Sequence, residues 1–186
     1  MSPRTCGSWL PPLANNPCTD GTFTLVPLSG PSSGAGSLEL EQYGVAPDEV
    51  KVDLDYAPQL TGNDSFVYSI THNSGQSFKN AKLTLVVPIG ETGSATKTVY
   101  GSYNSGTGVL SNIIGTLNVT DLLPTQTISL TQQYSTIYVQ DSYGGTKIDN
   151  VVNSYQTPGP LPILGAGAAF GFSRKLRERI KGSRIA

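Results

Sequence analysis

The stretch that decides the fold runs from Val50 to Tyr56 and reads VKVDLDY. Its apolar side chains alternate strictly with the charged residues Lys51, Asp53 and Asp55. Successive side chains of an extended strand point to opposite faces, so one face of this segment is apolar and the other is charged. The pattern therefore predicts a β-strand that is buried on one side.

The same alternation continues downstream of this strand. The segment Ser65 to Thr71 (SFVYSIT) predicts a second strand, with Phe66, Tyr68 and Ile70 directed inward. A turn cluster at 72–76 follows, and then a third strand at 81–87 (AKLTLVV). Because the two strands flank a Gly-containing turn, we expect them to pair as a hairpin.

Short β-branched and aromatic runs recur up to Tyr155, separated by Gly, Asn, Ser and Pro, and no stretch before Leu161 shows helical periodicity. Together they predict an antiparallel β-sandwich, jelly-roll or immunoglobulin-like, over residues 37–156. A turn at Ser142–Gly145 is expected to separate the last two runs. The further strands are predicted at 96–103, at 109–119 (one or two strands around Gly115), and at 127–130, 134–139 and 147–155.

Residues 1–36 are rich in Pro, Gly and Ser, and only 22–28 looks strand-like, so we expect an irregular leader there. This region contains both cysteines, Cys6 and Cys18. In an oxidising compartment they could close a small loop, and otherwise they remain two unpaired thiols. Their spacing and the single histidine of the chain do not make a zinc site.

Charge is distributed unevenly along the 186 residues. Residues 1–160 carry 6 basic and 12 acidic side chains, a net charge of −6, whereas the last 26 residues carry 6 basic and 1 acidic, a net charge of +5. An acidic body lacks the Lys and Arg that neutralise phosphates, so we expect no nucleic-acid partner. A basic tail beside an apolar run indicates a membrane instead.

The C-terminus divides into a proline-rich linker at 157–162 and an expected short membrane helix with a basic tail at 163–186. The 12 residues from Leu161 to Phe172 are uncharged. As a helix they reach about 18 Å, against a bilayer core of about 30 Å, so this is a marginal anchor that snorkelling basic side chains extend. The linker motif comprises Pro158, Gly159, Pro160 and Pro162; the membrane segment contains Leu161, Ile163, Leu164, Gly165, Gly167, Phe170, Gly171 and Phe172; the basic end contains Arg174, Lys175, Arg177, Arg179 and Lys181.

The segment PGPLPILGAGAAFGFSRKLRERIK, residues 158–181, resembles the cyanobacterial subclass of the PEP-CTERM sorting signal. The resemblance implies export, transient membrane anchoring and processing by an exosortase, a membrane cysteine protease, before transfer to the cell surface or extracellular matrix. Pro158-Gly159-Pro160 stands where the general motif has Pro-Glu-Pro. Members normally begin with a signal peptide, whereas residues 1–20 show no apolar run of that kind. The resemblance covers 24 of the 186 residues and implies no activity.

Catalytic and metal-binding patterns are weak. His72 is the only histidine, no GxSxG motif is present, and we expect His72 to be an exposed turn residue. Asp53 and Asp55 could offer oxygen ligands to calcium, but they lack the spacing of a calcium loop and are expected to form a solvated strand face. We therefore expect no enzyme, no metal and no cofactor.

Nine tyrosines leave the function of the β domain open. We expect them mainly in the sandwich core and at its rim, although tyrosines aligned on one sheet face would suit a sugar. Three hypotheses follow: a structural or adhesive surface or matrix protein, which we favour; a carbohydrate-binding module of the extracellular matrix; and a secreted hydrolase with an unrecognised site. The hydrolase would need a deep pocket with His72 or two facing carboxylates.

Overall fold

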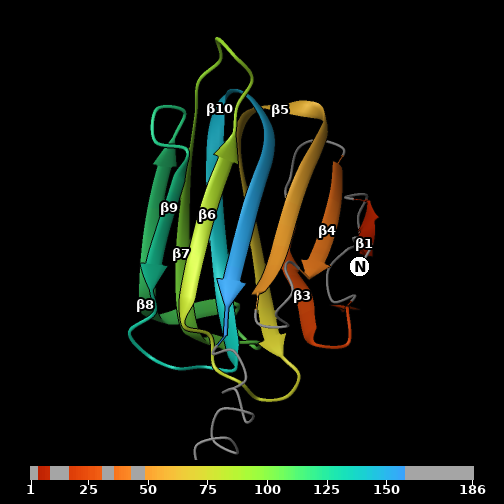
Figure 1. Cartoon of the computed structure of the whole chain (residues 1–186), viewed down its shortest axis with the longest axis vertical. Coiled ribbons are helices and arrows are strands. Elements are labelled where there is room, and N and C mark those ends of the chain that lie inside the picture. Colours follow the sequence, from red (N-terminus) through yellow and green to blue (C-terminus); the bar gives the residue numbers. More distant parts are fainter. Residues whose placement is uncertain (1–3, 9–16, 31–35, 43–48, 158–186) are drawn as a thin grey trace, which may run out of the picture.

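The computed structural model describes residues 4–8, 17–30, 36–42 and 49–157. These residues form strands joined by turns and loops (Figure 1). The strands are β1 (Arg4–Ser8), β2 (Cys18–Thr19), β3 (Phe23–Ser29), β4 (Gly36–Gln42), β5 (Glu49–His72), β6 (Asn80–Val86), β7 (Gly93–Asn104), β8 (Val109–Thr120), β9 (Thr125–Ser129) and β10 (Thr136–Gln156).

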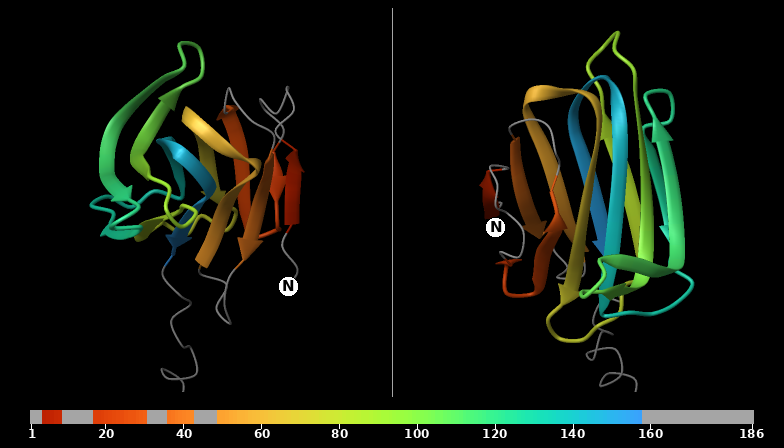
Figure 2. Two further views of the ribbon diagram at one scale, coloured as in Figure 1. Left: turned by 90° about the horizontal axis from the view of Figure 1, so that it is seen from above. Right: turned by 180° about the vertical axis from the view of Figure 1, so that it is seen from behind.

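Two long strands, β5 and β10, bend so that each belongs to both layers of an antiparallel sandwich (Figure 2). One layer has the order β1-β4-β5-β10-β6-β9 and uses the first half of β5 and the second half of β10. The other layer joins β3 to the second half of β5, then the first half of β10, β7 and β8. The predicted all-β antiparallel sandwich is thereby confirmed for the described residues.

The bend of β10 lies at Gly144 and Gly145, where a turn was predicted. That turn is wrong, because pairing continues through the glycines: Gly144 lies opposite Asn63 on β5 and Ser94 on β7. A Cβ on Gly145 would lie 2.1 Å from the carbonyl oxygen of Thr92. The glycine is therefore needed for close approach of two backbones at the point where the strand leaves one layer for the other.

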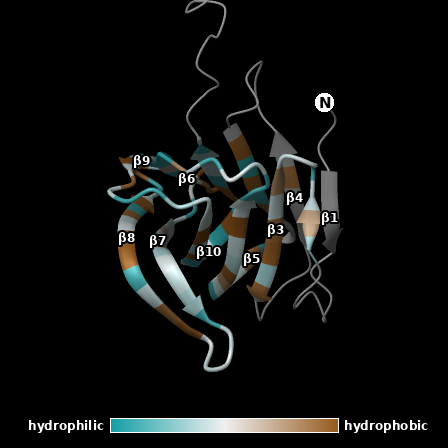
Figure 3. Cartoon of the chain, turned by 90° about the horizontal axis from the view of Figure 1, so that it is seen from below, coloured by the Kyte–Doolittle hydropathy of each residue, from teal (hydrophilic) through white to brown (hydrophobic). Residues whose placement is uncertain are grey.

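The core lies between the layers and follows the predicted alternation. Val50, Val52 and Leu54 of β5 are fully buried, and so are the aromatic and aliphatic residues of its second half, Phe66, Tyr68 and Ile70. Figure 3 shows apolar and polar residues alternating along these strands. Burying one large apolar side chain contributes roughly 1.5–3 kcal/mol, so such strands supply most of the stabilisation.

The expected hairpin between 65–71 and 81–87 is not formed. β6 pairs with β10 and β9, whereas the second half of β5 pairs with β10 and β3. Between His72 and Asn80 the chain crosses from one layer to the other, and Phe78 in this crossing is fully buried. The hairpin prediction is wrong because β10, which is distant in sequence, lies beside both strands and pairs with each of them.

The strand expected at 22–28 is confirmed as β3. The rest of residues 1–36 was expected to be irregular, and this is wrong for part of the described region, because β1 and β2 also lie there and β4 begins at Gly36. Pro27 is tolerated inside β3 because the register with β5 shifts just after it, between Pro27 and Ser29, and a proline has no N–H to donate. Cys18 is disulfide-bonded, and Cys6 is the only other cysteine in the chain.

The sorting motif, the membrane segment and the basic end all lie beyond Thr157, outside the described residues. Within the described ranges, no helix has the length and apolar character that crossing a membrane requires.

Candidate ligand-binding face

A group of tyrosines lies on the outer face of the layer that contains β7. Tyr100 of β7 and Tyr138 of β10 lie directly opposite each other in the register. Their neighbours Val99 and Val139 are fully buried, so alternation directs the two tyrosines outward, where both are partly exposed. We call Tyr100, Tyr103 and Tyr138 the tyrosine face.

Tyr103 belongs to this face because the end of the β7–β8 hairpin bends toward Tyr138. The rings of Tyr103 and Tyr138 are stacked, with centroids 5.5 Å apart and an interplanar angle of 30°. In a straight strand Tyr103 would lie about 10 Å beyond Tyr100, out of reach of Tyr138. A β-bulge in the register next to Tyr100, with Asn112 of β8 at a φ of 62°, bends the hairpin. Figure 2 shows the far ends of β7 and β8 curving away from the two layers.

Polar groups surround the rings. The Tyr100 hydroxyl donates to Oε1 of Gln140 at 3.3 Å, and the hydroxyls of Thr71 and Thr136 are hydrogen-bonded at 2.9 Å. Aromatic faces pack against apolar C–H surfaces, while hydroxyl and amide groups bind hydroxyls in defined directions. The arrangement therefore suits a flat ligand that is apolar on its faces and hydroxylated at its edges.

Four other tyrosines with described side chains do not contribute to this face. Tyr68, Tyr143 and Tyr155 are buried in the core, as expected for most of the tyrosines. Tyr134 packs on the hairpin at Gly101, where an added Cβ would lie 2.7 Å from its ring. The tyrosines whose side chains are described thus lie in the core, on the tyrosine face or, for Tyr134, against the hairpin.

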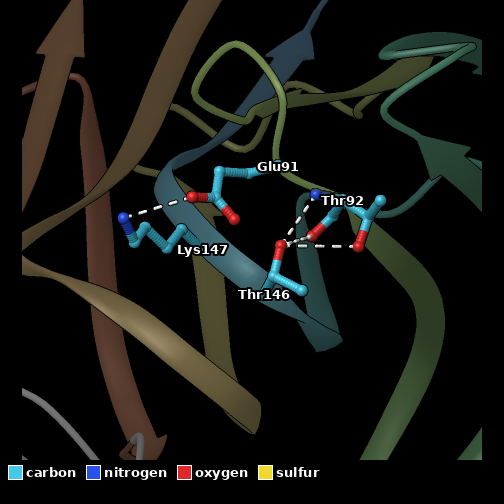
Figure 4. Close-up of polar contacts among 4 residues, drawn as sticks. All are labelled: Glu91, Thr92, Thr146 and Lys147. Atoms are coloured by element: carbon cyan, nitrogen blue, oxygen red, sulfur yellow. Dashed lines mark hydrogen bonds and ion pairs between the residues drawn. The ribbon is translucent and has the colours of Figure 1, made fainter.

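A second candidate site is a cavity of about 480 Å³ between the segment joining β6 to β7 and the segment joining β8 to β9. Glu91 and Asp121 line it. The Glu91 carboxylate forms an ion pair with Lys147 at 3.1 Å, beside the hydrogen bond from the Thr92 amide to the Thr146 hydroxyl (Figure 4). The hydroxyl of Thr146, and then Lys147, lower the pKa of Glu91. A general acid needs the opposite shift, so Glu91 is not tuned for that role.

His72 was expected to be an exposed turn residue, but it is buried at the end of β5. It is 5% exposed, and its ring packs edge-on against Phe23 with centroids 4.7 Å apart. Its Nδ1 lies 3.0 Å from the hydroxyl of Ser74. Burial lowers the pKa of His72, and the expectation of an exposed residue is wrong because the turn begins one position later.

For calcium or other metals, the described residues contain no group of three or more His, Cys, Asp or Glu side chains that could hold an ion. Asp53 lies partly buried on β5 rather than in a loop.

The sequence interpretation missed a polar cluster in the middle of the core. Lys97 of β7, Asp141 and Asn153 of β10 are each 0% exposed. Lys97 lies directly opposite Asp141 in the register. The signal was present, because each residue occupies an inward position of an alternating strand, as the buried flanking pairs Ala95 and Val99, Val139 and Tyr143, and Val151 and Tyr155 indicate.

The cluster connects the two layers. The Lys97 ammonium group donates to the carbonyl oxygen of Lys82 and to the hydroxyl of Tyr155, each at 3.1 Å, and lies 4.4 Å from the centre of the Tyr155 ring. The hydroxyl of Tyr155 is in turn hydrogen-bonded to that of Tyr68. Burial lowers the pKa of Lys97 to about 8, although the charge of Asp141 opposes the shift. Burial raises the pKa of Asp141 to about 6, against the attraction of Lys97.

No protein-family model matches the sequence, and no curated protein matches it either. Among solved structures, the chain is similar to the carbohydrate-binding module TmCBM27, described in a study of specific mannan recognition. The two share 10% sequence identity, and the alignment covers 84% of this chain and 99% of that chain with a TM-score of 0.36. A likeness at this level carries no argument about function.

Proposed function

We propose that this is an exported, non-catalytic surface or extracellular-matrix protein whose sandwich binds polysaccharide through the tyrosine face. The observation that carries the proposal is the stack of Tyr103 on Tyr138, beside Tyr100, on an outer sheet face. Sugar rings present C–H faces to aromatic rings and hydroxyls at their edges, which matches the groups that this face offers.

The face is held in place before any ligand arrives. The stack restrains Tyr103 and Tyr138, and the bond to Gln140 restrains Tyr100. Ordering a side chain on binding costs roughly 0.5–1.5 kcal/mol, so rings that are already ordered retain more of the contact energy as affinity.

Binding of the purified full-length protein to an array of soluble polysaccharides and oligosaccharides tests this proposal. Tyr138→Ala should weaken binding about tenfold or more, equivalent to at least ~1.4 kcal/mol. Ile89→Ala is the matched control, because Ile89 is a fully exposed apolar residue that lines the other cavity. If no glycan binds, or if both variants behave alike, the tyrosine face is not a sugar site and a purely structural or adhesive role is left.

The absence of catalysis is part of the proposal. It is supported by the buried position of His72 and by the lowered pKa of Glu91 in the cavity. A panel of ester and glycoside substrates tests it, and turnover that is lost in Glu91→Gln would replace the binding role with a hydrolase.

We further propose that residues 158–181 direct sorting, with an exosortase-type protease and the membrane as transient partners. The support is the combination of proline motif, apolar run and basic end in the sequence. Intact mass and cell fractionation test it. A body that ends near Pro160 and lies outside the cell is expected, and a full-length cytoplasmic product would contradict it.

A further inference from the structure

A lysine, a carboxylic acid and a carboxamide share one solvent-free position in the core. Lys97, Asp141 and Asn153 are each fully buried, so no dissolved substrate can reach them. The only reaction partners available to these groups are each other. Lysine amines and carboxamides are a nucleophile and an electrophile that can form an amide together.

The hydrogen bonds of Lys97 and the backbone register place its amine in the same part of the core as Asn153. The side chain of Lys97 crosses the core from one layer to the other, where its Nζ donates to the carbonyl of Lys82. Lys82 lies opposite Ser154, the residue that follows Asn153. The second acceptor of Nζ is the hydroxyl of Tyr155, two residues from Asn153 on the same inward face of β10.

Asp141 is the third member of the group. It lies opposite Lys97 on the neighbouring strand. Asn153 and Tyr68 lie near enough to lower the pKa of Asp141, yet neither oxygen of Asp141 has a partner in hydrogen-bonding geometry. The side-chain nitrogen and oxygen of Asn153 also lack a partner. Buried polar atoms without partners cost about 1–3 kcal/mol each, so a native core holds few of them.

We propose that Lys97 and Asn153 become joined by a side-chain amide bond, formed by the protein itself after folding, with Asp141 transferring the protons. The bond converts a buried amine and a partnerless carboxamide into one neutral amide. It also accounts for three polar residues at inward positions of otherwise apolar strands.

The reaction needs no oxidant and no cofactor. The Lys97 ammonium group first gives one proton to the Asp141 carboxylate, and the neutral Nζ then attacks Cγ of Asn153. A new C–N bond forms. Asp141 returns its first proton to the amide nitrogen Nδ2 and takes up the second proton from Nζ, so Asp141 ends the reaction protonated. The bond from Cγ to Nδ2 breaks, and ammonia leaves. In the core, burial brings the pKa of the lysine down to about 8 and that of the acid up to about 6, so the first proton transfer is far less uphill than in water.

Mass spectrometry of the full-length, reduced protein tests this proposal without any variant. The intact mass is expected to be lower than the sequence mass by one ammonia molecule, after allowance for loss of the initiating methionine. Trypsin cleaves after Lys and Arg, so the bond should hold fragments 83–147 and 148–174 together with Lys97 uncleaved. The full sequence mass, with separate 83–97 and 98–147 fragments, would overturn the proposal.

Two variants identify the bond. Lys97→Met removes the amine and keeps an apolar chain of similar length, so its mass should equal its sequence mass. An ammonia loss that persists in this variant would indicate cyclisation of Asn153 onto its own backbone and would reject the proposal. Loss of water instead of ammonia in the natural protein would place the bond on Asp141 and reject the assignment to Asn153. Asp141→Ala should leave most molecules unjoined, because the proton carrier is gone.

Discussion

Tyr68 of β5 and Tyr155 of β10 meet in the middle of the core, with their hydroxyl oxygens 2.5 Å apart. One ring comes from each layer of the sandwich, and both are 0% exposed. Burial is the main reason that the pKa of each hydroxyl is raised well above its usual value, so both remain neutral at physiological pH. The pair therefore forms a neutral polar connection between the layers.

The substitution Tyr155→Phe should lower the free energy of unfolding by roughly 1–3 kcal/mol, because Lys97 and Tyr68 each lose a buried partner. Urea denaturation measures the change. Tyr100→Phe is the matched control, since its hydroxyl makes a single long hydrogen bond of 3.3 Å on the outer face. The control should change stability by less than about 0.5 kcal/mol. Equal effects of the two changes would contradict the importance of the buried connection.

While Lys97 is still a free amine, the carboxyl group of Asp141 should have a pKa of about 6 rather than its ordinary value of 3.8. The folded state then binds this proton more tightly than the unfolded state. The contribution of Asp141 to stability is present below pH 4 and is lost as the pH rises toward 6, a change of roughly 2–3 kcal/mol. Titration of side-chain carboxyl carbons by NMR measures this pKa, with Asp141→Asn assigning the resonance. A value at or below 4 would show that the carboxyl group is hydrated.

Replacement of Gly145 by Ala should destabilise the fold by about 1–3 kcal/mol, because the new methyl group would overlap the carbonyl oxygen of Thr92. Gly30→Ala serves as the control, since a Cβ there has no neighbour within 4 Å. Thermal unfolding of both variants measures the difference. An unchanged melting temperature in Gly145→Ala would mean that the bend of β10 relaxes without cost.

Tyr138→Phe should retain most of the glycan affinity that Tyr138→Ala loses, because the stacked ring, rather than the hydroxyl, provides the contact. Isothermal titration calorimetry with the tightest glycan from the array distinguishes the two. Equal losses in both variants would assign the binding energy to the hydroxyl and point to a hydrogen-bonding site.

The alternation of apolar and polar residues was enough to predict a strand and its inward face. This prediction does not depend on which strand lies beside it. Val50, Val52 and Leu54 alternate with polar residues whatever lies beside them, so their inward direction was correct. The pairing partners could not be predicted. β5 and β6 follow each other in sequence, but β10 lies between them and pairs with both. Gly144 and Gly145 have the composition of a turn, and only the strands on either side keep them extended.

From the sequence, the tyrosines could be assigned only to one of two locations, the core and its rim or an outer sheet face. Tyr100 and Tyr138 have the same residue type as Tyr68 and Tyr155, and their strand alternation decides which are outside. Tyr103 could not be placed, since its contact depends on a bulge and on the left-handed conformation of Asn112. The sorting segment remains a prediction from its own sequence.

The central place of β10 has a consequence for the order of events during synthesis. It is the last strand of the described chain, and it pairs with β5, β6 and β7. Neither layer can close until this strand has left the ribosome, because its contacts join residues far apart in the chain. Strands that pair without it, such as β4 with β5 and β7 with β8, can associate earlier, but neither layer is complete until almost the whole described chain has been made.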